Sequence, residues 1–184
     1  RVLREGGRED AVGHGMRYCV GCTGWRSVPW RETFYPKSLP PSDYLSYYSK
    51  VFDFVEVNLG DSVNGNAAFS VNSMAKKWRR QTPSKFQFSI RIPAPILTDR
   101  KNHSLGAFLE DLAPIEENVL AALIDVPSSI SLADGREWLE DILGICTYHG
   151  YSAAVQFGNS SWYQDLAYSI LKRHHATLVW SDSH

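Results

Sequence analysis

The sequence is poor in cysteine, has no long apolar run and shows no excess of charge of either sign. It holds only three cysteines in 184 residues, a sparse and odd set that excludes a disulfide-rich secreted scaffold. Its 19 Lys and Arg residues against 20 Asp and Glu residues leave a net charge of −1, which excludes a strongly basic nucleic-acid binder and an acidic disordered tail. No apolar run approaches the roughly 18 residues of a membrane span, and residues 1–15 lack the hydrophobic stretch of a signal peptide. These absences predict a cytoplasmic protein that does not contact a membrane.

The sequence also lacks the signatures of three common sites: a redox cysteine pair, a zinc site and a dinucleotide-binding loop. Cys19 and Cys22 have C-x-x-C spacing, but they lie in a strand and the turn after it, whereas a redox pair needs its first thiolate at a helix N-terminus. The remaining cysteine, Cys146, lies in a helical segment and leaves too few ligands for a zinc site. Residues 21–24 hold too few glycines for a dinucleotide-binding loop. The sequence therefore predicts structural cysteines and no metal ligands, and it identifies no cofactor.

What the sequence does contain is a regular alternation of β-rich runs and helical periodicity, which is typical of βα units around a parallel sheet. We expect six strands, at residues 17–21, 54–58, 86–92, 120–126, 153–157 and 177–181. Helices are expected between them, at residues 42–52, 68–80, 105–112, 135–149 and 163–174. Ser42 is a candidate N-cap and Gly150 a candidate C′ residue. This pattern fits an open doubly wound sheet or part of an eight-stranded barrel.

A series of short motifs runs through the chain in a fixed order. It includes Gly21-Cys22-Thr23-Gly24-Trp25, Glu56-Val57-Asn58, Phe88-Ser89-Ile90-Arg91, Leu123-Ile124-Asp125-Val126-Pro127 and Gln156-Phe157 with Ser161-Trp162. From Met16 onward the chain resembles the YecE-like family, also called domain of unknown function 72. The resemblance implies a TIM-type barrel.

The resemblance also predicts how the chain is divided. Residues 1–15 are expected to be an extension or upstream translated sequence without a fold of their own. Residues 16–184 are expected to form the barrel domain. Since a complete TIM barrel takes about 250 residues, we expect an incomplete α/β barrel of about six βα units, truncated at its C-terminal side.

Alternation along the expected strands selects a set of polar residues. Alternate residues of a barrel strand face the interior, and active sites lie at the strand C-terminal ends. The residues selected in this way are Glu56, Asn58, Arg91, Asp125, Gln156 and Asp182. Because burying an unpaired carboxylate costs several kcal/mol, we expect Glu56 to form a buried ion pair with Arg91. That pair is either structural, or catalytic together with Asp182.

Aromatic residues and amides near the strand ends form a second candidate set. The first expected βα loop carries Trp25 and Trp30 together with Arg26 and Arg31, a combination that can stack a sugar or a base while Arg meets phosphate. The same residues could instead pack as a lid. Trp162 is expected at the same rim. Gln156 and Asn159 stand where relatives often carry Glu and His, so the resemblance implies an altered polar site.

Two functions follow from these residues. The first is a hydrolase or lyase that acts on a small phosphorylated or sugar-like substrate, with Arg91 holding an anion and Glu56 acting as acid or base. The second is a non-catalytic paralogue that binds a ligand or nucleic acid through the Trp and Arg side chains. The near-zero net charge disfavours nucleic acid.

Overall fold

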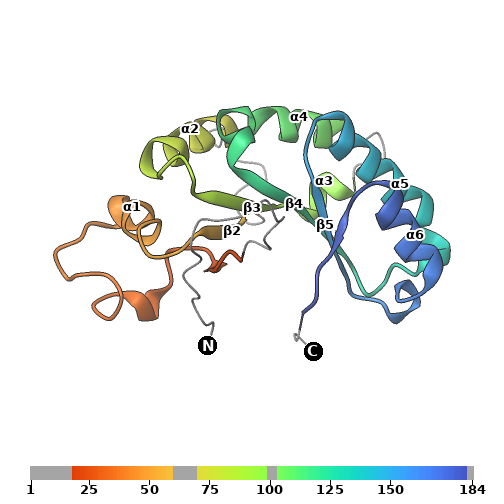
Figure 1. Cartoon of the computed structure of the whole chain (residues 1–184), viewed down its shortest axis with the longest axis horizontal. Helices are drawn as coiled ribbons and strands as arrows, with labels where there is room; N and C mark the ends of the chain where they lie inside the picture. Colours follow the sequence, from red (N-terminus) through yellow and green to blue (C-terminus); the bar gives the residue numbers. More distant parts are fainter. Residues whose placement is uncertain (1–17, 60–69, 99–102, 182–184) are drawn as a thin grey trace, which may run out of the picture.

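The computed structural model describes residues 18–59, 70–98 and 103–181, and these form a single arched sheet with helices along its outer side (Figure 1). The six strands are all parallel and lie in sequence order from β1 to β6. Their bounds are β1 Gly21–Thr23, β2 Phe54–Asn58, β3 Gln87–Arg91, β4 Val119–Val126, β5 Ala153–Phe157 and β6 Thr177–Leu178. The predicted α/β class and sequential parallel order are therefore confirmed. The sheet is open, with β1 and β6 at its two edges.

Helices follow the strands in the order expected of βα units. The α-helices are α1 Tyr44–Tyr48, α2 Val71–Gln81, α3 Ala94–Leu97, α4 His103–Asp111, α5 Leu132–Tyr148 and α6 Asp165–Arg173, and the short 3₁₀ turns are η1 Val28–Trp30, η2 Pro41–Asp43, η3 Ala113–Asn118 and η4 Ser160–Trp162. Figure 1 shows α2, α4, α5 and α6 along the convex side of the arch. Over the described ranges, none of these helices combines the length and apolarity needed to cross a bilayer.

Alternation along the strands builds the core between the sheet and the helices. Val55 and Val57 of β2, Phe88 and Ile90 of β3 and Val155 of β5 are buried. They pack in one hydrophobic cluster with helix residues that include Leu139, Ile142 and Ala167. The intervening strand residues occupy the opposite, concave face, which places the polar side chains of the central strands there.

The first strand begins later than predicted. Gly21, expected as its last residue, is its first. The preceding segment is held by Asp53, whose carboxylate accepts from the N–H of Val20 at 3.1 Å and whose own N–H donates to the carbonyl of Val20 at 2.9 Å. A side chain at Gly21 would collide with the carbonyl of Phe54, so the close approach of β1 to β2 requires glycine there.

Of the two predicted helix-end residues, Gly150 is confirmed and Ser42 is wrong. Gly150 follows the C-cap of α5 with φ +78°, as the predicted C′ residue should. Ser42 is not a helix cap: it lies inside η2, and α1 begins at Tyr44 without a capping side chain. The helix α3 was not predicted from the sequence, and it begins at Pro93-Ala94-Pro95, where proline favours the first helical turn.

Candidate functional site

Three charged side chains from neighbouring strands form a hydrogen-bonded row at the carboxyl ends of β2, β3 and β4. The Nε and Nη2 atoms of Arg91 donate to Glu56 Oε1 at 3.1 and 2.9 Å. The Nη1 atom of Arg91 donates to Asp125 Oδ2 at 2.5 Å. The predicted Glu56–Arg91 ion pair is thus confirmed, and Asp125 extends it. We call Glu56, Arg91 and Asp125 the strand-end row.

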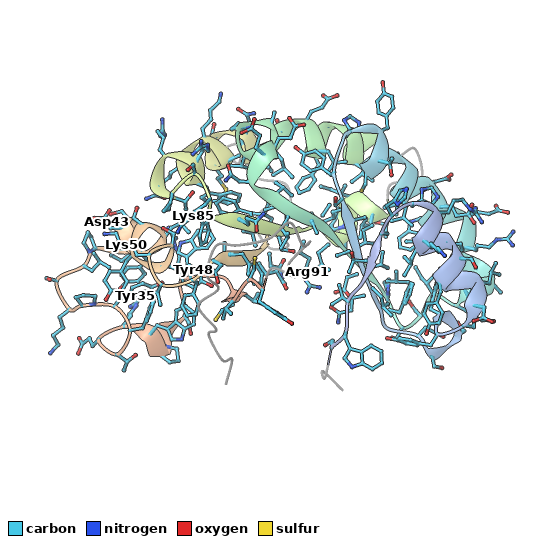
Figure 2. All side chains as sticks on the ribbon, viewed as in Figure 1. Tyr35, Asp43, Tyr48, Lys50, Lys85 and Arg91 are labelled. Carbon is cyan, nitrogen blue, oxygen red and sulfur yellow. The ribbon has the colours of Figure 1, made fainter. Side chains whose placement is uncertain are left out.

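Strand register explains why these residues meet. Glu56 pairs with Ser89, and Arg91, two residues further along β3, pairs with Asn58 and Leu123. Residues paired in a parallel sheet point to the same face, so the row lies on the concave side, away from the helices. Figure 2 shows Arg91 on this inner side of the arch.

The row is more open to solvent than the sequence predicted. The side chains of Glu56 and Arg91 are each 21% exposed and that of Asp125 is 50% exposed. The pair was predicted to be buried, and it is half-buried. The physical reason is that the concave face of the open sheet carries no helix layer among the described residues.

The charges of the row make it a hydrogen-bond acceptor and not an anion receptor. Two carboxylates and one guanidinium carry a formal charge of −1 in total, and Arg91 already spends three of its five N–H donors on the carboxylates. Glu56 Oε2 and Asp125 Oδ1 accept no hydrogen bond from any residue in the described part of the chain. These two oxygens can accept hydrogen bonds from hydroxyl groups of a ligand.

Other predicted residues surround the row to different degrees. Asn58 is the register partner of Arg91, and Gln156 is the register partner of Asp125, so both lie beside the row on the same face. Asp182 lies outside the described residues. Among the described residues, no group of three or more His, Cys, Asp and Glu side chains is arranged to hold a metal ion.

Of the two residues predicted at the end of β5, Trp162 is packed in the interior and Asn159 is half-buried. Trp162 is fully buried, stacks on Phe157 with ring centroids 4.9 Å apart, and donates its indole N–H to the carbonyl of Ile130 at 2.9 Å. The amide of Asn159 donates to Ser128 O at 2.7 Å and accepts from Ser161 N at 3.0 Å. The interpretation of Trp162 as a ligand-stacking residue is wrong. Asn159 uses its amide nitrogen and its amide oxygen in hydrogen bonds within the protein.

Trp30 lies in an aromatic cluster formed by the first βα loop and α1. Its ring stacks on Tyr48 and Phe52 at 6.0 and 6.5 Å and meets the edge of Phe34 at 5.4 Å. The structure thus groups Trp30 with packing residues and does not bring it to the strand-end row. We call Trp30, Phe34, Tyr35, Tyr44, Tyr47, Tyr48 and Phe52 the aromatic cluster.

The hydroxyls of two tyrosines in this cluster, Tyr35 and Tyr48, are bonded to backbone groups. The Tyr48 hydroxyl accepts from the N–H of Cys22 at 2.7 Å and donates to Phe54 O at 3.1 Å, and the Tyr35 hydroxyl donates to Trp25 O at 2.6 Å. Burial raises the pKa of Tyr35 to about 12 and also raises the pKa of Tyr48. These groups tie the loop to the sheet and are not placed for chemistry at neutral pH.

Trp25, in contrast, lines a cavity of about 430 Å³ beyond the end of β2. Asn58 lines the same cavity, and α2 contributes Lys77 and Gln81. Neither α2 residue was predicted as part of a site. Nothing in their local pattern distinguishes them from other exposed polar positions of an amphipathic helix.

The three cysteines are free thiols. Cys146 is buried, which raises its pKa to about 12. Cys19 donates from Sγ to Gln87 Oε1 at 3.5 Å. None of the three lies in the strand-end row.

Comparison with known proteins agrees with the architecture. A family model described as "Protein of unknown function DUF72" matches residues 19–184. The chain is similar to a solved DUF72 family protein from Thermotoga maritima MSB8, with 26% identity and a TM-score of 0.70, over 87% of this chain and 63% of that one. It is also similar to a solved DUF72 family protein from Enterococcus faecalis V583, with 19% identity and a TM-score of 0.61, over 86% and 60% of the two chains. The chain therefore spans about six-tenths of the length of these solved relatives. No curated protein matches the sequence.

Proposed function

Because this chain belongs to the DUF72 family of proteins of unknown function, we propose that it contributes six βα units of a TIM-type barrel that acts as a hydrolase or lyase on a small sugar-like substrate. The observation that carries the proposal is the strand-end row, in which two carboxylates each keep an oxygen without a hydrogen bond from the described residues. The free thiols of the three cysteines support a cytoplasmic location.

The position of the row supports a catalytic use. In TIM-barrel enzymes the reacting groups come from the carboxyl ends of several different strands. Glu56 is on β2, Arg91 is the last residue of β3, and Asp125 is one residue before the end of β4. The sequential parallel order of the six strands supports a barrel, because this is the order that a barrel of βα units has.

The charge of the row favours a hydroxyl-bearing substrate over a phosphorylated one. A phosphate placed against Arg91 would meet the two carboxylates that this guanidinium already neutralises. Sugar hydroxyls, in contrast, are donors that match the open oxygens of Glu56 and Asp125. We therefore assign Arg91 to holding the carboxylates in position, and not to holding an anion.

Two carboxylates on neighbouring strands can share acid–base work on such a substrate. In glycoside hydrolysis one carboxyl group protonates the leaving oxygen while a second one activates water or attacks the sugar. Glu56 and Asp125 are the candidates for these two roles. Asp125, which is half exposed, is the more accessible of the two.

Turnover of 4-nitrophenyl glycosides by the intact protein tests this proposal. We expect hydrolysis of at least one glycoside, and we expect Glu56→Gln and Asp125→Asn each to lower kcat by about 10²-fold or more, as the loss of a general acid or base does. Glu117→Gln is the matched control, because Glu117 is exposed and lies in η3, before β4 begins. Equal activity of the wild type and both row variants would refute the assignment.

A further inference from the structure

The cavity beside the strand-end row is lined by four separate parts of the chain. These are the loop after β1 with Trp25 and Arg26, the end of β2 with Asn58, helix α2 with Lys77 and Trp78, and η2 with Ser42. Its volume of about 430 Å³ falls in the range of about 300 to 1,000 Å³ found for small-molecule sites.

Positive charge is concentrated at this cavity. Arg26 and Lys77 both line it, and its described lining includes no carboxylate. Neither cation makes an ion pair or a side-chain hydrogen bond with a described residue. Arg26 comes from the loop after β1 and Lys77 from α2, and because both line the same cavity, both are available to one anionic group.

The cavity also has an aromatic lining residue, Trp25, whose ring and backbone are fixed by contacts with other residues. The Trp25 ring meets the buried Trp78 ring edge-on, with centroids 6.0 Å apart and an interplanar angle of 86°. The backbone on both sides of Trp25 is tied down, because its carbonyl accepts from Tyr35 Oη at 2.6 Å and the N–H of Gly24 donates to Glu56 O at 2.8 Å. Gly24 has φ +70°, a conformation that other residues rarely adopt. Trp25 is only partly buried, so it offers ring surface at a defined position.

We infer that this cavity is a second ligand site, which binds a phosphate monoester of an aromatic alcohol with its ring against Trp25 and its phosphate between Arg26 and Lys77. Neither part of this ligand suits the strand-end row, which carries net negative charge and no aromatic side chain. Asn58 lies between the two sites, because it lines the cavity and is the register partner of Arg91. The inference does not rest on the proposed chemistry of the row.

Titration of the intact protein with phenyl phosphate tests the site, and isothermal titration calorimetry measures the binding of each ligand to the wild type and to each variant. Inorganic phosphate and phenol serve as the two half-ligands, and we expect phenyl phosphate to bind more tightly than either. Arg26→Gln and Lys77→Gln should each weaken binding of phenyl phosphate about tenfold, which corresponds to the loss of one charge-assisted hydrogen bond. Trp25→Leu should reduce its affinity to that of inorganic phosphate.

Two matched controls separate a built site from diffuse charge. Arg31 is an exposed arginine of the same loop, and Lys76 is the exposed neighbour of Lys77 on α2; neither lines the cavity. We expect Arg31→Gln and Lys76→Gln to leave the affinity within about twofold, as exposed charges outside a contact do. Equal weakening by the controls, or binding of phenyl phosphate no tighter than that of inorganic phosphate, overturns the inference. Since the readout is binding and not turnover, failure of the row to catalyse a reaction leaves this test unaffected.

Discussion

The aromatic cluster and the strand-end row use polar atoms in opposite ways. In the cluster, Tyr35 and Tyr48 are buried and their hydroxyls are bonded to backbone groups. In the row, Glu56 and Asp125 share one guanidinium, and each keeps an oxygen that no described residue satisfies. A buried hydroxyl that is hydrogen-bonded to backbone stabilises the fold, whereas an open acceptor at a strand end is available to a ligand.

The contrast shows that a high density of conspicuous side chains is a poor guide to function in this chain. The aromatic cluster is the richest aromatic region of the described structure, and its rings contact one another at centroid distances that begin at 3.9 Å. Figure 2 shows Tyr35 and Tyr48 in the lobe formed by the first loop and α1, apart from Arg91 on the inner side of the arch. The sparse charged residues at alternate strand positions are the better functional candidates.

The largest difference between the aromatic cluster and the strand-end row is expected in the loss of stability at high pH. Burial raises the pKa of Tyr35 from 10.0 to about 12 and raises that of Tyr48 as well. Each of these tyrosines keeps a proton in the folded chain that the unfolded chain loses near pH 10. The free energy of unfolding should therefore be unaffected by these groups below about pH 9 and fall from pH 10 to 12, by about 1.4 kcal/mol per pH unit for each tyrosine.

Urea denaturation at pH 8, 10 and 11 measures this loss of stability. Tyr48→Phe is the control variant, because it removes one titrating group and should make the decline less steep. An unfolding free energy that stays constant from pH 8 to pH 11 would show that Tyr35 and Tyr48 are not buried.

The next largest effect is expected from truncating one ring of the aromatic cluster. Tyr48 is fully buried, and its ring packs on Phe52 at 4.5 Å and on Trp30 at 6.0 Å. Tyr48→Ala should destabilise the fold by about 3–5 kcal/mol, as the loss of a buried aromatic side chain does. Tyr48→Phe keeps the ring but leaves the N–H of Cys22 without its acceptor, and should cost about 1–2 kcal/mol.

Chemical denaturation of the two variants measures both values. Equal losses for Ala and Phe would assign the stabilisation to the hydroxyl and contradict the view that the rings hold this region together.

The central strands could be predicted closely from the sequence, for a physical reason. Strands β2 and β5 span the predicted residues 54–58 and 153–157. Each carries buried apolar residues on the helix side and a polar residue on the other, which gives alternation a clear signal. The start of β1 was predicted too early because its position depends on Asp53 and on the close approach of Gly21 to Phe54. Those contacts are distant in sequence and leave no local pattern.

The candidate site could be predicted where alternation alone places a residue. Alternation of side chains along the strands predicts that Glu56, Arg91 and Asp125 lie on one face, and in the structure Arg91 is hydrogen-bonded to both carboxylates. Alternation applies to strands and not to loops, so it could not predict that Trp162 stacks on Phe157. It also could not show that Lys77 of α2 faces the loop after β1. Such pairs form only when βα units pack on one another.

The smallest of the three effects on stability is expected in the strand-end row. Variants of Glu56 and Arg91 test how much their ion pair contributes to the free energy of unfolding. Removing one partner of a fully buried ion pair costs about 3–5 kcal/mol, and an exposed pair contributes about 0–1 kcal/mol. With side chains 21% exposed, Arg91→Met and Glu56→Gln should each cost about 1–2 kcal/mol, less than Tyr48→Ala. Because each single change leaves the other charge partly uncompensated, the double change should cost less than the sum of the two.

Urea denaturation of the two single variants and the double variant measures this coupling. A loss of 3–5 kcal/mol in either single variant would show that the row contributes to folding as strongly as the aromatic cluster, and the contrast between the two regions would no longer hold.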